Sequence, residues 1–320
     1  MSEMRWDPIR GEWLVTATHR MDRPQMPRDW CPFCPGSGRV PEHYDVHIFP
    51  NDFPSFATPP PEPGLSATKE WRTRKSWGVC DVVLYHPDHH RDFVNLELDH
   101  LHKIGRLWRQ RYLELFKNKR VKYVFIFENH GEEIGVTMPH PHGQIYGFPL
   151  VPPIPAREMK RADAYRAKHG SCLHCDLLAA DRADGRRVLF DDGAWTAIVP
   201  YYARWPFEAH LYPNRCVQHL GQLDDAELRP MMRAIKRVLG AYLSYYGKTY
   251  PYILCFHQAP PRGPLGKGAH LHVELYPIRR SPTKMKYRAG CETGAGLFIN
   301  DSYPEEKAAE LREHLPPLED

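Results

Sequence analysis

The sequence lacks any long hydrophobic run. No segment approaches the roughly 20 consecutive apolar residues that a membrane-spanning helix needs. The N-terminal residues 1–6 also lack the apolar core of a signal peptide. Nor is there an excess of one charge, since 43 basic and 39 acidic residues give a formal net charge of only +4. A non-specific nucleic-acid binder carries a strong basic stripe. We therefore expect a cytoplasmic enzyme that binds neither membranes nor nucleic acid.

The cysteines are informative through their spacing. Among the eight cysteines of the 320-residue chain are two CxxC pairs, Cys31 with Cys34 and Cys172 with Cys175. A cytosolic protein keeps its thiols reduced, so such pairs favour metal binding over a disulfide. A redox-active CxxC is the alternative for the first pair. However, no βαβ pattern follows Cys34, as such a motif would require.

A His-Pro-His-Gly-Gln row predicts a strand with one chemically active face. In an extended backbone, alternation points His140, His142 and Gln144 to the same side. Pro141 between the two histidines lacks the N–H that a sheet hydrogen bond needs. We therefore expect this strand at the edge of a sheet, or with its backbone facing a ligand.

The order of features along the chain occurs twice. A CxxC pair, a strand, a turn, a long amphipathic helix, a strand and a histidine row recur, and the second row holds His270 and His272. Apolar spacing predicts the two helices at residues 99–118 and 224–245. Because hairpins and loops plus one helix join the strands, we predict an α+β duplication with antiparallel sheets. The predicted halves cover residues 1–155 and 156–320.

Each half carries candidate ligands for one zinc ion. Two thiolates from one CxxC turn are the spacing that structural zinc uses, and imidazole or a further thiolate completes a tetrahedral set. The first predicted set is Cys31, Cys34, His89 and His140. By duplication, the second predicted set is Cys172, Cys175, Cys216 and His270. His219 stands close to Cys216 in the sequence and stays open as its rival.

If His140 binds a metal, His142 is free for chemistry. A neutral imidazole is a good nucleophile near neutral pH, and a phosphorus centre would be its electrophile. Gln144, on the same face, could donate its amide to a non-bridging phosphate oxygen. The glycine-bearing segment 129–137 offers main-chain amides and the Thr137 hydroxyl as further donors. The sequence therefore predicts an anion site built around a nucleophile.

Further motifs, in order along nearly the whole chain, accompany this row. They are Asp7-Pro8 with Gly11-Glu12-Trp13, Cys31-Pro32-Phe33-Cys34, Asn51-Asp52-Phe53, Pro87-Asp88-His89, Phe127-Glu128-Asn129, Trp205-Pro206-Phe207-Glu208, His270-Leu271-His272 and the tail from Lys286 to Glu292. Together they resemble the galactose-1-phosphate uridylyltransferase family of the histidine-triad superfamily. The resemblance implies a duplicated histidine-triad-like fold and a ping-pong reaction. UDP-glucose would give its uridylyl group to a histidine, and galactose 1-phosphate would then accept it.

Carried over by position, the resemblance implies that His142 is the nucleophile and Gln144 a phosphate ligand. It also implies a set of substrate-binding residues: Arg20, Arg23, Asn51, Asp52, Phe53, Asn129, Gly135, Thr137, Lys286 and Glu292. Arg23 and Lys286 match residues that the family's dimer sends into the neighbouring site, so we expect a homodimer. From spacing alone, the arginines near residue 20 form either a solvated surface or a phosphate clamp.

Three departures from the family pattern leave alternatives open. Cys291 replaces an aromatic residue, and a glutamine is missing from residues 294–298. Both changes fall where the hexose should bind. Members without the second CxxC pair hold their second metal with a glutamate and histidines, and the matching set here is Glu158, His257, His270 and His272. The alternative functions are a nucleoside-diphosphate-sugar phosphorylase with the same histidine, and a non-catalytic zinc-stapled nucleotide-binding module.

Overall fold

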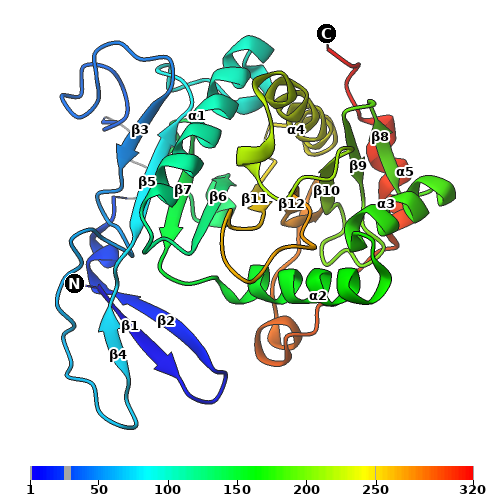
Figure 1. Cartoon of the computed structure of the whole chain (residues 1–320). Coiled ribbons are helices and arrows are strands. Elements are labelled where there is room, and N and C mark those ends of the chain that lie inside the picture. Colours follow the sequence, from blue (N-terminus) through cyan, green and yellow to red (C-terminus); the bar gives the residue numbers. More distant parts are fainter. Residues whose placement is uncertain (1, 25–29, 249, 320) are drawn as a thin grey trace.

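A continuous antiparallel sheet runs through the centre of the chain (Figure 1), as the computed structural model of residues 2–24, 30–248 and 250–319 shows. Its order is β3-β5-β7-β6-β11-β12-β10-β9-β8. The strands are β3 (His47–Pro50), β5 (Val79–Leu84), β6 (Tyr123–His130), β7 (His142–Phe148), β8 (Val188–Asp191), β9 (Trp195–Ile198), β10 (Ala209–Pro213), β11 (Tyr252–His257) and β12 (His272–Pro277). The predicted α+β class with antiparallel strands is confirmed.

Strands β6 and β11 join the two halves of this sheet. They pair antiparallel, with Tyr252 opposite His130 and Cys255 opposite Phe127. Outward from this seam the order is β6-β7-β5-β3 on one side and β11-β12-β10-β9 on the other, with β8 beyond. The two histidine-row strands, β7 and β12, thus occupy equivalent places on either side of the seam.

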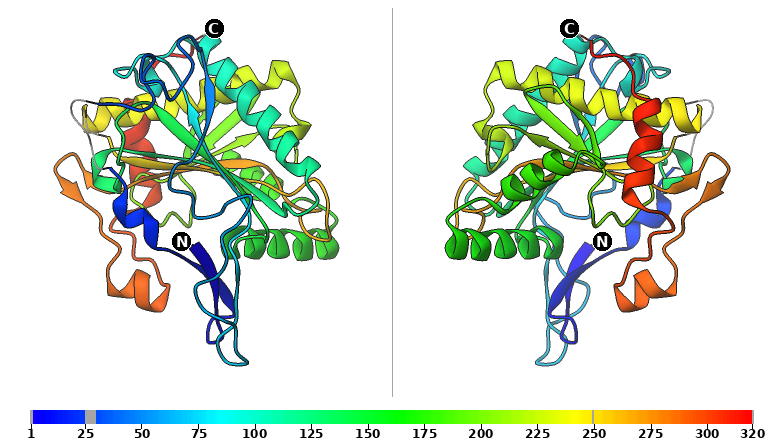
Figure 2. Two further views of the ribbon diagram at one scale, coloured as in Figure 1. Left: turned by 90° about the vertical axis from the view of Figure 1, so that its left-hand side faces the viewer. Right: turned by 90° about the vertical axis from the view of Figure 1, so that its right-hand side faces the viewer.

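Two long helices cover one face of the sheet and pack side by side (Figures 1 and 2). They are α1 (Leu98–Lys117) and α4 (Asp225–Tyr246), each within one residue of the bounds predicted from apolar spacing. A capping box holds the start of α4, in which Asp224 and Glu227 each accept a hydrogen bond from the other's main-chain N–H. The apolar face of each helix is buried against the strands, which drives this packing.

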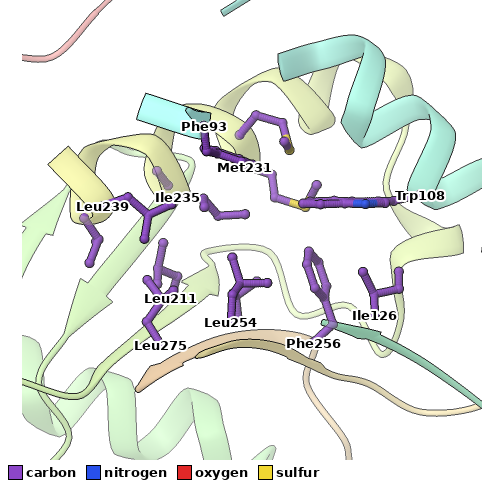
Figure 3. Packing of buried hydrophobic residues seen from close by; sticks show 14 of the residues in the cluster. Phe93, Trp108, Ile126, Leu211, Met231, Ile235, Leu239, Leu254, Phe256 and Leu275 are labelled. Atoms are coloured by element: carbon purple, nitrogen blue, oxygen red, sulfur yellow. The ribbon is translucent and has the colours of Figure 1, made fainter. Parts of the chain in front are cut away.

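The core lies between these helices and the sheet. Figure 3 shows Trp108 of α1 and Met231 of α4 above Leu254 and Phe256 of β11. All four side chains are fully buried. Because one core spans both halves, the seam between them is held by hydrophobic burial as well as by the β6–β11 hydrogen bonds.

The opposite face is covered by elements that the sequence did not predict. Met159 of α2 and Leu178 of α3 pack there against Tyr123 and Ile198. These helices are α2 (Pro153–His169) and α3 (Leu173–Asp184). A separate sheet of β1 (Ser2–Asp7), β2 (Glu12–Ala17) and β4 (Thr73–Lys75) packs over β5 and β7 through Met4. The remaining elements are α5 (Pro304–Glu313) beside β8 and α4, and the hairpin of β13 (Arg279–Ser281) and β14 (Lys284–Met285). None of the helices in the described residues is both long and apolar enough to cross a membrane.

β7 does not lie at a sheet edge, so the edge position, the first of the two alternatives predicted from Pro141, is wrong. β7 runs between β5 and β6 and pairs with both. The strand begins only at His142, after the proline, so the missing N–H of Pro141 removes no sheet hydrogen bond. The carbonyl of Pro141 accepts a hydrogen bond of 3.0 Å from the Tyr85 N–H.

Candidate active site

His142 opens β7 on the sheet face opposite α1. Ile145 faces the α1 side of the core, so alternation turns His142 and Gln144 the other way. The Nδ1 atom of His142 lies 2.7 Å from the main-chain oxygen of His140. An N–H at Nδ1 donates to that carbonyl, and in the neutral ring this leaves Nε2 with a free lone pair. Burial lowers the pKa of His142, which favours this neutral form.

Gln144 is oriented by its neighbour on the same face. The Tyr146 hydroxyl donates to Oε1 of Gln144 at 3.0 Å. Because the amide oxygen is engaged, the amide NH₂ group is left to donate to a ligand. Gln144 and His142 thus lie on the same face of β7, the arrangement that strand alternation predicts.

Gly143 is required by close packing beneath the backbone next to His142. A Cβ at this position would meet the hydroxyl of Tyr85 and would lie 2.8 Å from Cζ of its ring. Tyr85 is buried and its N–H is bound to Pro141, so the ring cannot move aside easily. Tyr85 therefore supports the His140–His142 backbone from below, a role that the sequence motif alone did not reveal.

A cavity of about 330 Å³ lies in front of His142 and Gln144. Its aromatic lining consists of Trp30, Phe33, Phe49 and Phe53. Its polar lining consists of Arg23, Arg39, Asn51, Asp52, Thr137, His142 and Gln144. An apolar pocket with a few convergent polar groups is the usual form of a small-molecule site. The aromatic side chains could stack on a base, the carboxylate and amide oxygens could accept hydrogen bonds from sugar hydroxyl groups, and the arginines could bind phosphates.

Most of the predicted substrate residues lie in or beside this cavity. The Arg23 guanidinium donates to the Thr137 hydroxyl at 3.0 Å, within the chain's own cavity. Asn51 Oδ1 accepts a 2.9 Å bond from the Phe53 N–H, which fixes the turn that carries Asp52. Arg20 donates to the Phe53 main-chain oxygen at 2.9 Å and does not line the cavity. The structure thus places Arg20 as a support of the 51–53 turn.

The remaining predicted substrate residues lie elsewhere. Asn129 lines an adjoining cavity of about 180 Å³, which His142 also borders. Gly135, at φ +81°, closes the short helical turn at Glu132–Ile134 and lines neither cavity. Lys286 and Glu292 are buried against each other, with Nζ 3.8 Å from Oε1, and they also line neither cavity of their own chain.

The first predicted metal set converges at one point. The ligand atoms of Cys31, Cys34, His89 and His140 all lie within 4.8 Å of one another. His140 Nδ1 is 3.6 Å from both sulfurs, and its Nε2 lies 2.8 Å from the main-chain oxygen of His86. That carbonyl fixes the ring with Nδ1 directed at the thiols, as the outer shell of a metal-binding histidine does. Burial raises the pKa of Cys34 to about 12 and lowers that of His140 to about 4. A bound cation would stabilise the Cys34 thiolate and the neutral His140 imidazole, the forms that coordinate a metal.

The second predicted set has the same construction. The ligand atoms of Cys172, Cys175, Cys216 and His270 also lie within 4.8 Å of one another. His270 Nδ1 is 3.5 Å from the Cys175 sulfur, and its Nε2 lies 3.0 Å from the Pro213 main-chain oxygen. A hydrogen bond from the Cys216 thiol lowers the pKa of Cys172 to about 3, so a thiolate is already favoured there. Both groups have the donors of a tetrahedral Cys/His metal site.

The rival residues are not part of this second group. His219 stacks on Tyr112 with ring centroids 5.4 Å apart. Glu158, His257 and His272 form a third group of three converging donors, in which Glu158 Oε2 lies 2.7 Å from His257 Nδ1. The competition expected for His270 does not arise, because His270 lies with the cysteines and His272 with the glutamate.

Comparison with known proteins places this architecture in a class. A solved uridylyltransferase structure superimposes with a TM-score of 0.89 at 36% sequence identity, and 98% of each chain is covered. A solved ADP-glucose phosphorylase from Arabidopsis thaliana shares the fold, with a TM-score of 0.74 at 22% identity. The first of these likenesses defines a protein of the uridylyltransferase class.

The sequence comparisons name the family. The model of the galactose-1-phosphate uridyl transferase N-terminal domain matches residues 1–152, and that of the C-terminal domain matches residues 158–319. The galactose-1-phosphate uridylyltransferase of Thermotoga maritima is 35% identical over 315 residues, which cover 98% of both chains. That of Haemophilus influenzae is 30% identical over 96% of this chain and 93% of its own. The chain belongs to the galactose-1-phosphate uridylyltransferase family.

Proposed function

We propose that the chain transfers UMP from UDP-glucose to galactose 1-phosphate through a covalent uridylyl-histidine at His142. The observation that carries this proposal is the orientation of His142. Its Nδ1 is engaged by the His140 carbonyl, which leaves Nε2 for chemistry, and His142 lines a cavity together with Gln144 and Arg23. Family membership supports the choice of substrates.

The proposed reaction has two balanced steps. First, Nε2 attacks the α-phosphorus of UDP-glucose; an N–P bond forms and the P–O bond to glucose 1-phosphate breaks. Next, a phosphate oxygen of galactose 1-phosphate attacks the same phosphorus, which re-forms neutral His142 and yields UDP-galactose. Gln144 would donate to a non-bridging oxygen as charge builds there, while Arg23 and Thr137 stabilise the phosphates. Asn51, Asp52 and Phe53 would hold the uridine.

We further propose zinc at both cysteine groups, because two or three thiolates with imidazole are its usual structural ligands. Bound zinc would tie the 31–34 turn to the start of β7, and the start of α3 to the start of β12. The Glu158, His257 and His272 group is the alternative position for the second metal. Activity at His142 requires no step at either ion.

Other parts of the proposal rest on the family resemblance. A homodimer would bring Lys286 of one subunit into the site of the other, and Glu292 would contact the hexose; neither residue lines either of the two cavities that His142 borders. Arg23, the other residue expected to cross between subunits, lines the cavity of its own chain. Asn129 and Gly135 would approach the sugar phosphate. The division into halves at residues 155 and 156 and a cytoplasmic location also remain proposals. The location is supported by eight cysteines without a disulfide.

Covalent labelling tests the proposal directly. Incubation with UDP-glucose labelled in the α-phosphate should transfer label to His142, and glucose 1-phosphate should exchange into UDP-glucose without galactose 1-phosphate. His142→Gly should lose labelling, exchange and turnover, whereas the exposed control His169→Gly should keep all three. If His142→Gly retained more than roughly a thousandth of the rate, acid–base assistance would suffice and the covalent mechanism would be wrong. Release of UDP with inorganic phosphate as acceptor would indicate the phosphorylase.

A further inference from the structure

Arg39 lies in the nucleotide cavity and pairs with Asp52. Its Nη2 atom is 2.6 Å from Oδ1 of Asp52, and its guanidinium carbon lies 5.7 Å from the centroid of the Phe49 ring. Both side chains of the pair are partly exposed, at 44% and 37%. Exposed ion pairs contribute little to folding. The pair therefore calls for an explanation within the cavity.

Charge in the cavity supplies this explanation. Among the described residues that line it, Asp52 is the only acid, and Arg23 and Arg39 are the only cations that are permanently charged. A nucleoside diphosphate sugar brings two negative charges into this space. An unpaired Asp52 carboxylate lining the same cavity would repel them, because like charges placed close together in a complex weaken binding. Arg39 neutralises that carboxylate, while Arg23 donates to Thr137 in the same cavity.

The geometry of the pair also leaves one Asp52 oxygen able to accept hydrogen bonds from a ligand. The bond to Arg39 engages Oδ1, so Oδ2 can still accept hydrogen bonds from hydroxyl groups of a ligand. Contact with the face of Phe49 keeps the guanidinium plane in place. A lysine could supply the charge, but it lacks the planar guanidinium that bonds to Asp52 and at the same time lies over the Phe49 ring.

We propose that Arg39 is a positioning residue for nucleotide binding, which neutralises and orients Asp52 so that this acid can bind nucleoside hydroxyls beside a diphosphate. The inference rests on the proposed function and adds a residue to it. Arg39 acts on binding rather than on the reacting phosphorus. Its loss should therefore raise the KM for UDP-glucose and leave kcat nearly unchanged.

A double-mutant cycle tests this role. Arg39→Ala should raise the KM for UDP-glucose on the order of tenfold, the size of effect expected for coupled neighbours. Arg39→Lys should recover part of it. In an Asp52→Asn background, where no negative charge remains to be neutralised, Arg39→Ala should change KM by less than about threefold. The control is Arg106→Ala, which removes an arginine of similar exposure that pairs with Asp225 outside the cavity; it should leave KM unchanged.

Two outcomes would overturn the inference. A wild-type KM for UDP-glucose in Arg39→Ala would show that the Arg39–Asp52 pair does not contribute to nucleotide binding. An equal loss from Arg39→Ala in the wild-type and Asp52→Asn backgrounds would show that Arg39 contacts the nucleotide itself and does not act through Asp52. In both cases His142 labelling would remain, so the proposed function would stand. If the proposed covalent mechanism were wrong, the His142→Gly variant would instead still be labelled and active.

Discussion

Nδ1 of His142 lies 2.7 Å from the main-chain oxygen of His140, so the residue that belongs to the first Cys/His group also orients the imidazole proposed as the nucleophile. The same relation holds in the second half, where His272 Nδ1 lies 2.8 Å from the His270 oxygen. In the first half the second histidine lines the cavity with Gln144, whereas in the other half Nε2 of His272 lies 3.3 Å from the Glu274 carboxylate. Metal binding and catalysis are therefore expected to be linked in the first half alone.

The first prediction tests this link. Cys34→Ser should lose about one zinc per chain and slow the uridylylation of His142 by roughly 10- to 100-fold, the usual effect of disturbing the support of a site residue. Cys175→Ser, the matched change in the second half, should also lose metal but keep its rate. Metal analysis and single-turnover labelling measure both effects. Equal rates in the two variants would mean that metal at Cys34 does not position His142.

The second prediction concerns the position of the second metal. Cys216→Ser should lose about one zinc per chain and lower the thermal midpoint, because a thiolate that joins α3 to the β10 turn and His270 is gone. His257→Ala should keep that zinc. Metal content and thermal unfolding of the two purified variants decide between the groups. Metal loss from His257→Ala, with none from Cys216→Ser, would place the ion at Glu158, His257 and His272.

Apolar spacing and the internal repeat were sufficient to predict much of the fold. The helices α1 and α4 carry wide apolar faces, and their bounds followed from that pattern. Helix α2 buries only Pro155, Met159 and Ala162, a face too narrow for the same reasoning. The β6–β11 seam depends on pairing between strands far apart in the sequence, which no local pattern encodes. The wrong edge position for β7 has a different cause: Pro141 was placed inside the strand, whereas the strand begins at His142.

The parts of the candidate site that could be predicted are those in which residues close in the sequence are brought together by local spacing. Two CxxC pairs and two histidine rows named both metal groups, and alternation put His142 beside Gln144. Contacts between distant segments were missed. Tyr85 meets Gly143 only through the β5–β7 pairing, and Arg39 meets Asp52 only when the chain folds back at β3. Lys286 and Glu292 came from the family resemblance, and they line neither of the two cavities that His142 borders.

The third prediction concerns Gly143. Gly143→Ala should destabilise the protein by about 1–3 kcal/mol, the usual effect of overpacking a core, and should slow His142 labelling. The added methyl group meets the Tyr85 ring, so Tyr85→Phe should restore part of both losses by removing the hydroxyl. Denaturant unfolding and labelling of the single and double variants measure this. No rescue in the double variant would mean that the backbone, and not the hydroxyl, limits this position.

The last prediction concerns the pH dependence of stability. Glu128 is buried at 4% exposure and accepts a 2.6 Å bond from the Tyr252 hydroxyl. Burial raises the pKa of its carboxyl group from 4.5 to about 7. Between these two values the folded state keeps a proton that the unfolded state has released. Stability therefore falls as pH rises through this window, and the loss is complete above the folded pKa.

Glu128→Gln removes this titration and keeps an oxygen that can accept the bond from Tyr252. Relative to wild type, the variant should be of similar stability at pH 5 and more stable at pH 8. The shift corresponds to at most about 3 kcal/mol at 1.36 kcal/mol per pKa unit. Calorimetry at the two pH values would show the thermal midpoint of the variant rising above that of wild type by several degrees at pH 8. A difference that stays constant from pH 5 to pH 8 would mean that Glu128 does not titrate in this range, and that a partner within the fold keeps it ionised.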